Sequence, residues 1–284
     1  METAILNNGV VMPLLGYGVY QVKPEDCEKC VLDAVSVGYR LIDTAQGYFN
    51  EEAVGRAIVA CGVPRTELFV TTKVWIEHYG FEKARESVLR SMDKLKCDYL
   101  DLVLLHQPFS DYYGSYRALE ELYGQGLLKA IGVSNFYPDR LSDLCAFNEV
   151  IPQVNQVETH PFNQKIVAQQ NMIKNKVQIE AWAPFGEGRN DMFGNAALNQ
   201  IGAKYGKSAA QVILRWLVQR GVVALAKSTR IERMRENFAI FDFTLSEQDM
   251  TLIQTLDTAK SLFFSHQDPA TVDFFVELIK KRRQ

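Results

Sequence analysis

The sequence has 284 residues, of which 47% are hydrophobic and 23% are charged, so it is long enough to bury a large core. Its net charge of −3, with no basic block beyond Lys280–Arg283, gives no electrostatic footprint for nucleic acid or an anionic membrane. The start lacks the pattern of a signal peptide and no apolar run approaches the roughly 18 residues of a spanning helix, so we expect a cytoplasmic protein that acts on small molecules.

Short apolar runs alternate with helical patterns from one end of the chain to the other. Two short runs around Asn8 and Gly9 predict a β-hairpin ahead of the first longer run. The later runs are strand candidates, at 14–20, 39–44, 68–75, 100–106, 130–136, 153–158, 178–184 and 222–228. Strand–helix units of roughly 30 residues each predict an α/β fold, a (β/α)8 TIM barrel in one domain over 1–284, with the N-terminal β-hairpin closing its bottom.

Helical periodicity fills the stretches between these runs. Over 82–95 the apolar residues fall on one face, and Ser208 is placed to cap a helix over 208–219. Ser246, with Asp249 three residues later, resembles a capping box for a further helix. These stretches predict the outer helices of the barrel.

A doubly wound sheet is the main competing fold. A sheet of that kind that binds a dinucleotide should show GxGxxG directly after its first strand. Here residues 16–18 read GYG and are followed by VYQ, with no third glycine. The barrel is therefore favoured.

The cysteines do not form the pattern of a disulfide framework, because their number is odd and they are scattered. Cys27 and Cys30 form a CxxC, but it lies inside a helical pattern with no second pair and no nearby histidine. Ordinary helix positions are favoured over a zinc or redox site there. A reducing compartment is indicated by all five: Cys27, Cys30, Cys61, Cys97 and Cys145.

The segment LIDTAQGYFNEEAVG, at 41–55, predicts a strand that ends near Asp43 and a helix that starts after Asn50. Asp43 and Tyr48 then lie in a strand-to-helix connection, at the end of the sheet where α/β folds bind ligands. The plainer interpretation is that Asp43 caps a turn and Tyr48 is a half-buried packing residue.

Polar residues also follow the other apolar runs. Taken singly, each has a structural explanation: Lys73 could snorkel at a strand end, and His106 could be a satisfied core histidine. Polar side chains that point into one cavity are costly to bury unless they satisfy one another or a ligand. Together the set predicts a shared site, made of Asp43, Lys73, His106, Ser134, Asn135, Gln156 and Lys227.

The residue types in this set favour one kind of chemistry. An aspartate keeps a neighbouring lysine charged, and a charged lysine beside a phenol is expected to lower the pKa of Tyr48 toward the working pH. Tyr48 could then protonate a carbonyl oxygen, while His106 orients that oxygen through a hydrogen bond. None of these groups can supply a hydride, so a nicotinamide cofactor is required.

These motifs, in this order and over essentially the whole chain, resemble an aldo-keto reductase, and among its members the bacterial diketogluconate reductases. The most specific segments are GYRLIDTAQGYFNEEAVG, LLHQP, IGVSNF, NQVE and AKSTRIERMREN. The resemblance implies a barrel that binds NADPH and reduces aldehydes and ketones to alcohols. It also implies that the catalytic residues are Asp43, Tyr48, Lys73 and His106.

The same resemblance assigns the cofactor contacts. Ser134, Asn135 and Gln156 match positions that hold the nicotinamide carboxamide, and Trp182 replaces the usual tyrosine that stacks on the ring. Ala183 replaces a common serine near the pyrophosphate, in the segment that continues to Phe185. The remaining matches grip the 2′-phosphate (Lys227, Ser228, Thr229 and Arg233) and the adenine (Glu236 and Asn237).

Substrate preference is less specific in the sequence. Tyr20, Trp75, His106 and Phe109 match or neighbour the usual pocket positions and suggest an aromatic mouth. The tail from Leu262 is shorter than the loop of steroid-handling relatives, which favours small aldehydes, dicarbonyls and sugar-derived ketones. We expect a monomer, and no metal, since His78, His106, His160 and His266 lack HxH or HExxH spacing.

Two other functions remain open at this point. One is a non-catalytic NADPH-binding barrel with a structural or regulatory role, which turnover of NADPH with a simple aldehyde would exclude. The other is an aldolase or decarboxylase that uses Lys73 or Lys227 as a Schiff-base nucleophile. Borohydride trapping of a substrate adduct on either lysine would support that function.

Overall fold

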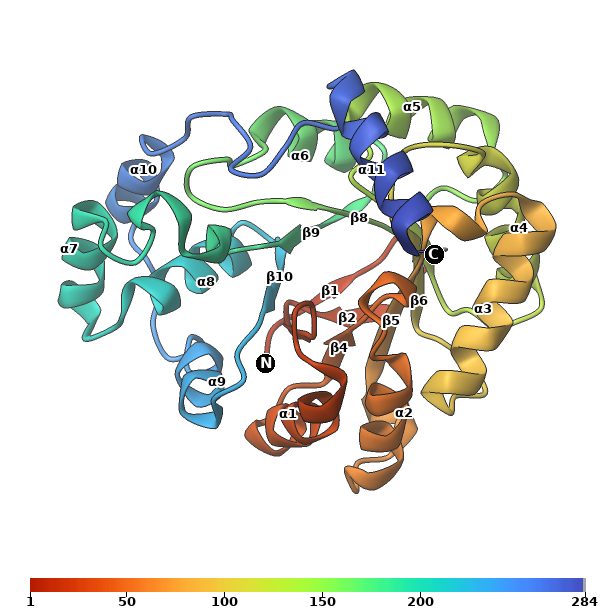
Figure 1. The fold of residues 1–284 in the computed structure, drawn as a ribbon. Helices are drawn as coiled ribbons and strands as arrows, with labels where there is room; N and C mark the ends of the chain where they lie inside the picture. Colours follow the sequence, from red (N-terminus) through yellow and green to blue (C-terminus); the bar gives the residue numbers. More distant parts are fainter. Residues whose placement is uncertain (283–284) are drawn as a thin grey trace.

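A computed structural model describes residues 1–282 of the protein, so Arg283 of the C-terminal basic run lies outside the described residues. Eight parallel strands close into a barrel in the order β10-β3-β4-β5-β6-β7-β8-β9 (Figure 1). Their bounds are Leu15–Gly18 (β3), Leu41–Asp43 (β4), Phe69–Val74 (β5), Leu102–Leu105 (β6), Ile131–Ser134 (β7), Val154–Glu158 (β8), Gln178–Trp182 (β9) and Val223–Ala226 (β10). The predicted (β/α)8 barrel is confirmed, and each predicted strand contains one of these eight.

A short hairpin precedes the barrel, formed by β1 (Thr3–Ile5) and β2 (Val11–Pro13). The Asn7 amide at its turn donates to the carbonyls of Pro152 and Lys176, both 3.1 Å away, just before β8 and β9. Asn8 donates to the carbonyl of Lys129, 2.9 Å away, before β7. These bonds hold the hairpin across the amino-terminal ends of the strands, so it closes the bottom as predicted.

The helices surround the barrel (Figure 1). The capping residues predicted at Ser208 and Ser246 are confirmed, since each side chain accepts a hydrogen bond from the backbone N–H three residues later. The helix bounds are Pro24–Val37 (α1), Glu51–Ala60 (α2), Phe81–Leu95 (α3), Tyr112–Gly124 (α4), Pro138–Phe147 (α5), Ile166–Lys174 (α6), Ala196–Tyr205 (α7), Ala209–Gln219 (α8), Ile231–Phe238 (α9), Glu247–Gln254 (α10) and Pro269–Arg282 (α11). Short 3-10 turns occupy Gln46–Tyr48 (η1), Arg65–Glu67 (η2), Ile76–His78 (η3) and Gly186–Asp191 (η4).

Asn50 stands at the predicted start of α2, but its side chain does not cap the helix. Its amide nitrogen donates to the carbonyl of Val19, 3.0 Å away, and its oxygen accepts from the hydroxyl of Thr44 at 2.8 Å. The buried amide therefore ties the loop after β3 to the loop after β4. It fixes the connection that carries Tyr48.

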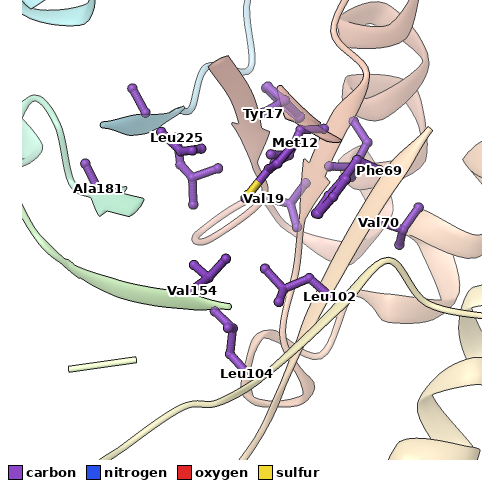
Figure 2. Packing of buried hydrophobic residues seen from close by; sticks show 14 of the residues in the cluster. Met12, Tyr17, Val19, Phe69, Val70, Leu102, Leu104, Val154, Ala181 and Leu225 are labelled. Atoms are coloured by element: carbon purple, nitrogen blue, oxygen red, sulfur yellow. The ribbon is translucent and has the colours of Figure 1, made fainter. Parts of the chain in front are cut away.

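The lower half of the barrel interior is apolar. Leu41 and Leu225 are almost completely buried and fill the space beside Gly16, where a Cβ atom would overlap both side chains. Figure 2 shows further apolar side chains gathered in this region, Met12, Leu102 and Val154 among them. This packed layer supports the polar residues that follow on the same strands.

The C-terminal segment, expected from the sequence only as a short tail, crosses to the mouth of the barrel. The backbone N–H of Leu262 donates to Glu158 Oε1 at 2.8 Å, and His266 Nε2 lies 2.9 Å from Gln107 Oε1. Beyond these anchors the chain forms α11, dark blue in Figure 1. Within residues 1–282, no helix combines the length and apolar character needed to cross a membrane.

Candidate active site

Four predicted residues meet where the strands end. Asp43 ends β4, Tyr48 ends η1, Lys73 lies near the end of β5, and His106 directly follows β6. Lys73 Nζ lies 2.6 Å from Asp43 Oδ1 and 3.3 Å from the Tyr48 hydroxyl, and it also donates to the carbonyl of Thr44 at 3.0 Å. The structure therefore brings the predicted Asp–Lys–Tyr arrangement together at one ammonium group.

Burial and the neighbouring groups together set the pKa values of the ion pair. Lys73 is fully buried, and burial alone would lower its pKa, but Asp43 and Tyr48 outweigh burial and raise it. For Asp43 burial raises the pKa, while the charge of Lys73 and the bond from Gln156 lower it in part. Lys73 is thus a cation, which is the wrong form for a Schiff-base nucleophile.

Tyr48 differs from the expectation drawn from the sequence. Burial raises the pKa of its phenol to about 12, and the lowering effect of Lys73 is smaller than that of burial. The expected fall toward the working pH is therefore wrong for this structure. The phenol keeps its proton at neutral pH and can donate it, and Lys73 lies in position to stabilise the phenolate that donation leaves.

His106 is neutral for a related reason. Burial, with the charge of Lys73 next in size, lowers its pKa well below the usual value. Its ring lies 5.6 Å from that of Tyr48 and 5.2 Å from that of Trp75, measured between centroids. Within residues 1–282, His106 Nδ1 and Trp75 Nε1 are buried polar atoms without a hydrogen-bond partner. Two such atoms on neighbouring rings fit a site that binds a polar ligand.

Aromatic rings form the mouth beside these groups. Tyr20 is half exposed, and its ring lies 5.0 Å from that of Tyr48. Phe275 of α11 lies 5.9 Å from Trp75 and 5.8 Å from Phe109, which places the C-terminal helix at the pocket. Phe275 was not predicted as a site residue, although it belongs to a Phe-Phe pair in the C-terminal tail.

A second group of predicted residues continues from the catalytic cluster. The Ser134 hydroxyl donates to the backbone carbonyl of Gln156 at 2.9 Å, and the Asn135 amide donates to Ser134 Oγ at 3.1 Å. Trp182 Nε1 donates to Asn135 Oδ1 at 2.8 Å. Gln156 Nε2 donates to Asp43 Oδ2 at 3.0 Å, so this group is joined directly to the ion pair.

The turn after Trp182 leaves β9 with a left-handed residue. Ala183 has φ 48°, and Phe185 follows it with its ring centroid 5.6 Å from that of Phe193. The ring of Phe263, from the C-terminal segment, lies 5.1 Å from that of Trp182. Trp182 thus lies beside the C-terminal segment at the mouth, and Phe185 packs against Phe193.

Two of the exposed cations in the segment after β10 are predicted site residues. Lys227 and Arg233 are exposed, and neither makes an ion pair within the described part of the chain, so Arg233 does not pair with Glu236, three residues later on the same helix. Arg233 lies in the first turn of α9, where backbone N–H groups and the helix dipole favour an anion. The other predicted residues here are Ser228, Thr229 and Glu236, at or near the surface, and Asn237, which is buried.

Glu180, in the middle of β9, was not predicted as a site residue. It is fully buried, and its Oε2 accepts a hydrogen bond from Gln156 Nε2 at 2.9 Å. An acidic residue inside the apolar run QIEAW was the signal for it. Burial is costly for such a group unless it has a structural or chemical role.

The structure gives little support for redox or metal chemistry at the cysteines of α1. Cys27 and Cys30 are buried free thiols of α1, and burial raises the pKa of Cys27 to about 12, which makes it unreactive. Between residues 1 and 282, no group of three or more His, Cys, Asp or Glu side chains is arranged to hold a metal ion.

Comparison with known proteins agrees with this geometry. A model of the aldo/keto reductase family matches residues 14–258. The chain is 43% identical to morphine 6-dehydrogenase of Pseudomonas putida over 283 residues, covering 94% of each, and 45% identical to glyoxal reductase of Bacillus subtilis over 258 residues, covering 90% and 93%. Its fold matches an aldo-keto reductase of Bombyx mori solved in complex with NADP, with a TM-score of 0.87, 29% identity, and coverage of 91% and 94%.

Proposed function

The chain belongs to the aldo/keto reductase family, and we propose that Asp43, Tyr48, Lys73 and His106 perform the proton chemistry of its NADPH-dependent carbonyl reduction. The family and its named reductases make the protein an NADP-dependent oxidoreductase that reduces small aldehydes and ketones to alcohols. NADPH supplies, when bound, the hydride that no side chain can provide. The observation that carries the proposal is the buried Lys73 ammonium, within hydrogen-bond reach of both Asp43 and Tyr48.

Each residue has a separate part in this proposal. The substrate carbonyl oxygen lies between the Tyr48 hydroxyl and the His106 imidazole, and Tyr48 gives it a proton. Neutral His106 orients the oxygen through a hydrogen bond. Lys73 stabilises the phenolate left on Tyr48, and Asp43 keeps Lys73 charged and fixed in place.

The cofactor contacts follow from the second group of residues. Ser134, Asn135 and Gln156 would hold the nicotinamide carboxamide, and the ring of Trp182 would stack on the nicotinamide. Lys227 and Arg233 would bind the 2′-phosphate, since both are exposed cations beside the start of α9. The remaining proposed contacts are Ala183 and Phe185 near the pyrophosphate, Ser228 and Thr229 near the phosphate, and Glu236 and Asn237 near the adenine.

We assign small aldehydes, dicarbonyls and sugar-derived ketones as the substrate class. Trp75, Phe109 and Phe275 bring three aromatic rings close together over the catalytic cluster, which restricts the mouth. Tyr20 adds a fourth ring, beside Tyr48. The relative named glyoxal reductase supports the same class.

A panel of carbonyl compounds, assayed with NADPH and with NADH, tests this assignment. We expect glyoxal, methylglyoxal and 4-nitrobenzaldehyde to be reduced with NADPH, at higher kcat/KM than any polycyclic ketone. NADH should give a higher KM for the cofactor, because it lacks the 2′-phosphate. Preferential turnover of morphinan or steroid ketones would overturn the substrate assignment, and no turnover of any carbonyl would overturn the catalytic one.

We also propose that residues 1–284 form one reductase domain that acts as a monomer in the cytoplasm. Every residue of the proposed site comes from a single chain, so no second subunit is required to complete it. All five cysteines are free thiols, as is typical of a reducing compartment. Light scattering on the purified protein would contradict the monomer if it gave a mass of twice 32.2 kDa.

A further inference from the structure

Glu180 lies beside Gln156 inside the barrel, in the layer of the ion pair. The two residues are register partners on the neighbouring strands β9 and β8. Glu180 Oε2 accepts from Gln156 Nε2 at 2.9 Å, and Glu180 Oε1 has no hydrogen-bond partner within residues 1–282. A fully buried carboxyl group of this kind is not needed for packing alone, because an apolar side chain would cost less there.

The amide of Gln156 is held by two acceptors at once. Its nitrogen donates to Glu180 Oε2 and also to Asp43 Oδ2, which reaches it from β4 at 3.0 Å. A primary amide nitrogen has only two hydrogens, so both are used. The amide oxygen, Gln156 Oε1, accepts no hydrogen bond from the described residues and remains available to a ligand.

Glu180, the second acceptor, restricts the orientation of the Gln156 amide. If Asp43 were the only acceptor, the amide nitrogen of Gln156 would stay bonded to it. The amide group could then turn so that its second N–H faced the cofactor. With Glu180 present, that rotation would break a buried hydrogen bond, and a full flip of the amide would place its oxygen against the Asp43 carboxylate, which cannot donate. Glu180 therefore removes the alternative in which Gln156 offers a donor to the ligand.

Glu180 does this without adding a second charge. Burial, with the negative charge of Asp43 next in size, raises the pKa of Glu180 to about 8, while Gln156 and Lys73 lower it in part. Near pH 7 the side chain is therefore mainly the neutral acid, which accepts through its carbonyl oxygen. The interior keeps one carboxylate, Asp43, opposite one cation, Lys73.

We propose that Glu180 is a positioning residue that, together with Asp43, commits the Gln156 amide oxygen to accept a hydrogen bond from the NH2 group of the nicotinamide carboxamide. This inference rests on the proposed placement of the carboxamide beside Ser134, Asn135 and Gln156. It specifies a preference for pyridine nucleotides that carry an amide NH2. The 3-acetylpyridine analogue of NADP carries a methyl group at that point and cannot donate.

The test is a ratio of dissociation constants, measured by quenching of tryptophan fluorescence and not by activity. The wild type should bind NADP roughly 10-fold tighter than its 3-acetylpyridine analogue, the upper range for one neutral hydrogen bond. Glu180→Leu should bring this ratio close to one. Glu180→Gln should restore it, because the new carbonyl can accept the same bond from Gln156. A Glu180→Leu ratio equal to that of the wild type would overturn the inference.

Two controls separate the possible causes. Adenosine 2′,5′-bisphosphate lacks the nicotinamide, so its affinity should be equal in the wild type and in Glu180→Leu if the variant is folded. A role in packing alone would change both dinucleotide affinities together and leave their ratio unchanged, which would also overturn the inference.

Gln156→Leu distinguishes a failure of this inference from a failure of the proposed function. If Gln156→Leu keeps the wild-type ratio, the carboxamide does not bind Gln156, and both proposals fail at that contact. If Gln156→Leu abolishes the ratio while Glu180→Leu retains it, the cofactor placement stands and only the role of Glu180 is overturned.

Discussion

Leu41 and Asp43 are neighbours on the same face of β4, yet they belong to two different halves of the barrel interior. Leu41 lies in the lower half, which is packed with apolar side chains and stabilises the fold by their burial. Asp43 lies in the upper half, where Lys73, Gln156 and Glu180 are also buried and polar. Such groups are costly to bury even when paired, so the upper half is organised for ligand chemistry more than for stability.

Lys73→Met, in the upper half, should have the largest effect, and this effect should be on catalysis. Loss of the ammonium removes the group that stabilises the Tyr48 phenolate, and we expect kcat for carbonyl reduction to fall by roughly 10²–10⁴. The measurement is steady-state NADPH oxidation from pH 6 to 9. The variant also leaves Asp43 without its counterion, so the double variant Asp43→Asn, Lys73→Met is the control: it should recover stability but not turnover. Wild-type rates in either variant would make Lys73 a structural residue.

Leu41→Ala, in the lower half, should reduce the stability of the fold and leave catalysis unchanged. Truncation creates a cavity beside Gly16, and we expect the free energy of unfolding to fall by about 2–5 kcal/mol, measured with urea. The kcat of the folded enzyme should be unchanged. Val59→Ala, at an exposed site on α2, is the matched control and should cost less than about 0.5 kcal/mol. A large loss of kcat in Leu41→Ala would show that the two halves are not separable.

Arg233→Ala tests the proposed phosphate contact, which lies outside the buried part of the upper half. We expect the dissociation constant of NADPH to rise roughly 10- to 100-fold, since a charge-assisted contact contributes about 1.5–3 kcal/mol, while that of NADH changes little. Arg235→Ala removes another exposed arginine of the same helix and should affect neither. An unchanged NADPH-to-NADH ratio in Arg233→Ala would contradict the phosphate contact.

His266 gives the smallest effect, and it depends on pH. Burial, with the charges of Lys165 and Arg140, lowers its pKa to about 3 from the ordinary 6.5. As the pH falls, the unfolded chain therefore takes up a proton on His266 before the folded chain does. The contribution of His266 to stability is complete above pH 6.5 and is lost as the pH falls toward 3. Between pH 7.5 and pH 5 the loss should be about 2 kcal/mol.

The comparison for this prediction is His266→Gln, which does not titrate and can still donate to Gln107. Urea unfolding of both proteins at pH 7.5 and pH 5 isolates the histidine, because all other groups are shared. An equal loss of stability in both proteins would show that His266 is not protonated on unfolding in this range.

The two halves also differ in how far the sequence predicted them. The lower half followed from the alternation of apolar runs and helical patterns, because buried strand residues such as Leu41 leave a direct apolar pattern in the sequence. Polar residues at the strand ends predicted which side chains would meet in the upper half, and the contacts of Lys73 agree with that prediction. Their catalytic roles remain predictions for the experiments above.

Three features of the upper half could not be predicted from local patterns. The pKa of Tyr48 rises because burial outweighs the charge of Lys73, and the balance of these effects depends on three-dimensional packing. The contact of Phe275 with Trp75 joins residues 200 positions apart, so the partner of Phe275 depends on how the C-terminal helix packs in three dimensions. Glu180 was visible as an acid in an apolar strand, but its hydrogen bond with Gln156 was not predicted.

The central claim is that the Tyr48 hydroxyl supplies the proton for carbonyl reduction. The most direct measurement is the rate of NADPH oxidation with 4-nitrobenzaldehyde for Tyr48→Phe, with the dissociation constant of NADPH determined on the same sample. The account predicts a rate lower by roughly 10²–10⁴ with cofactor binding nearly unchanged, because the substitution removes the acidic proton but little of the cavity. A rate equal to that of the wild type, with NADPH bound normally, would contradict it.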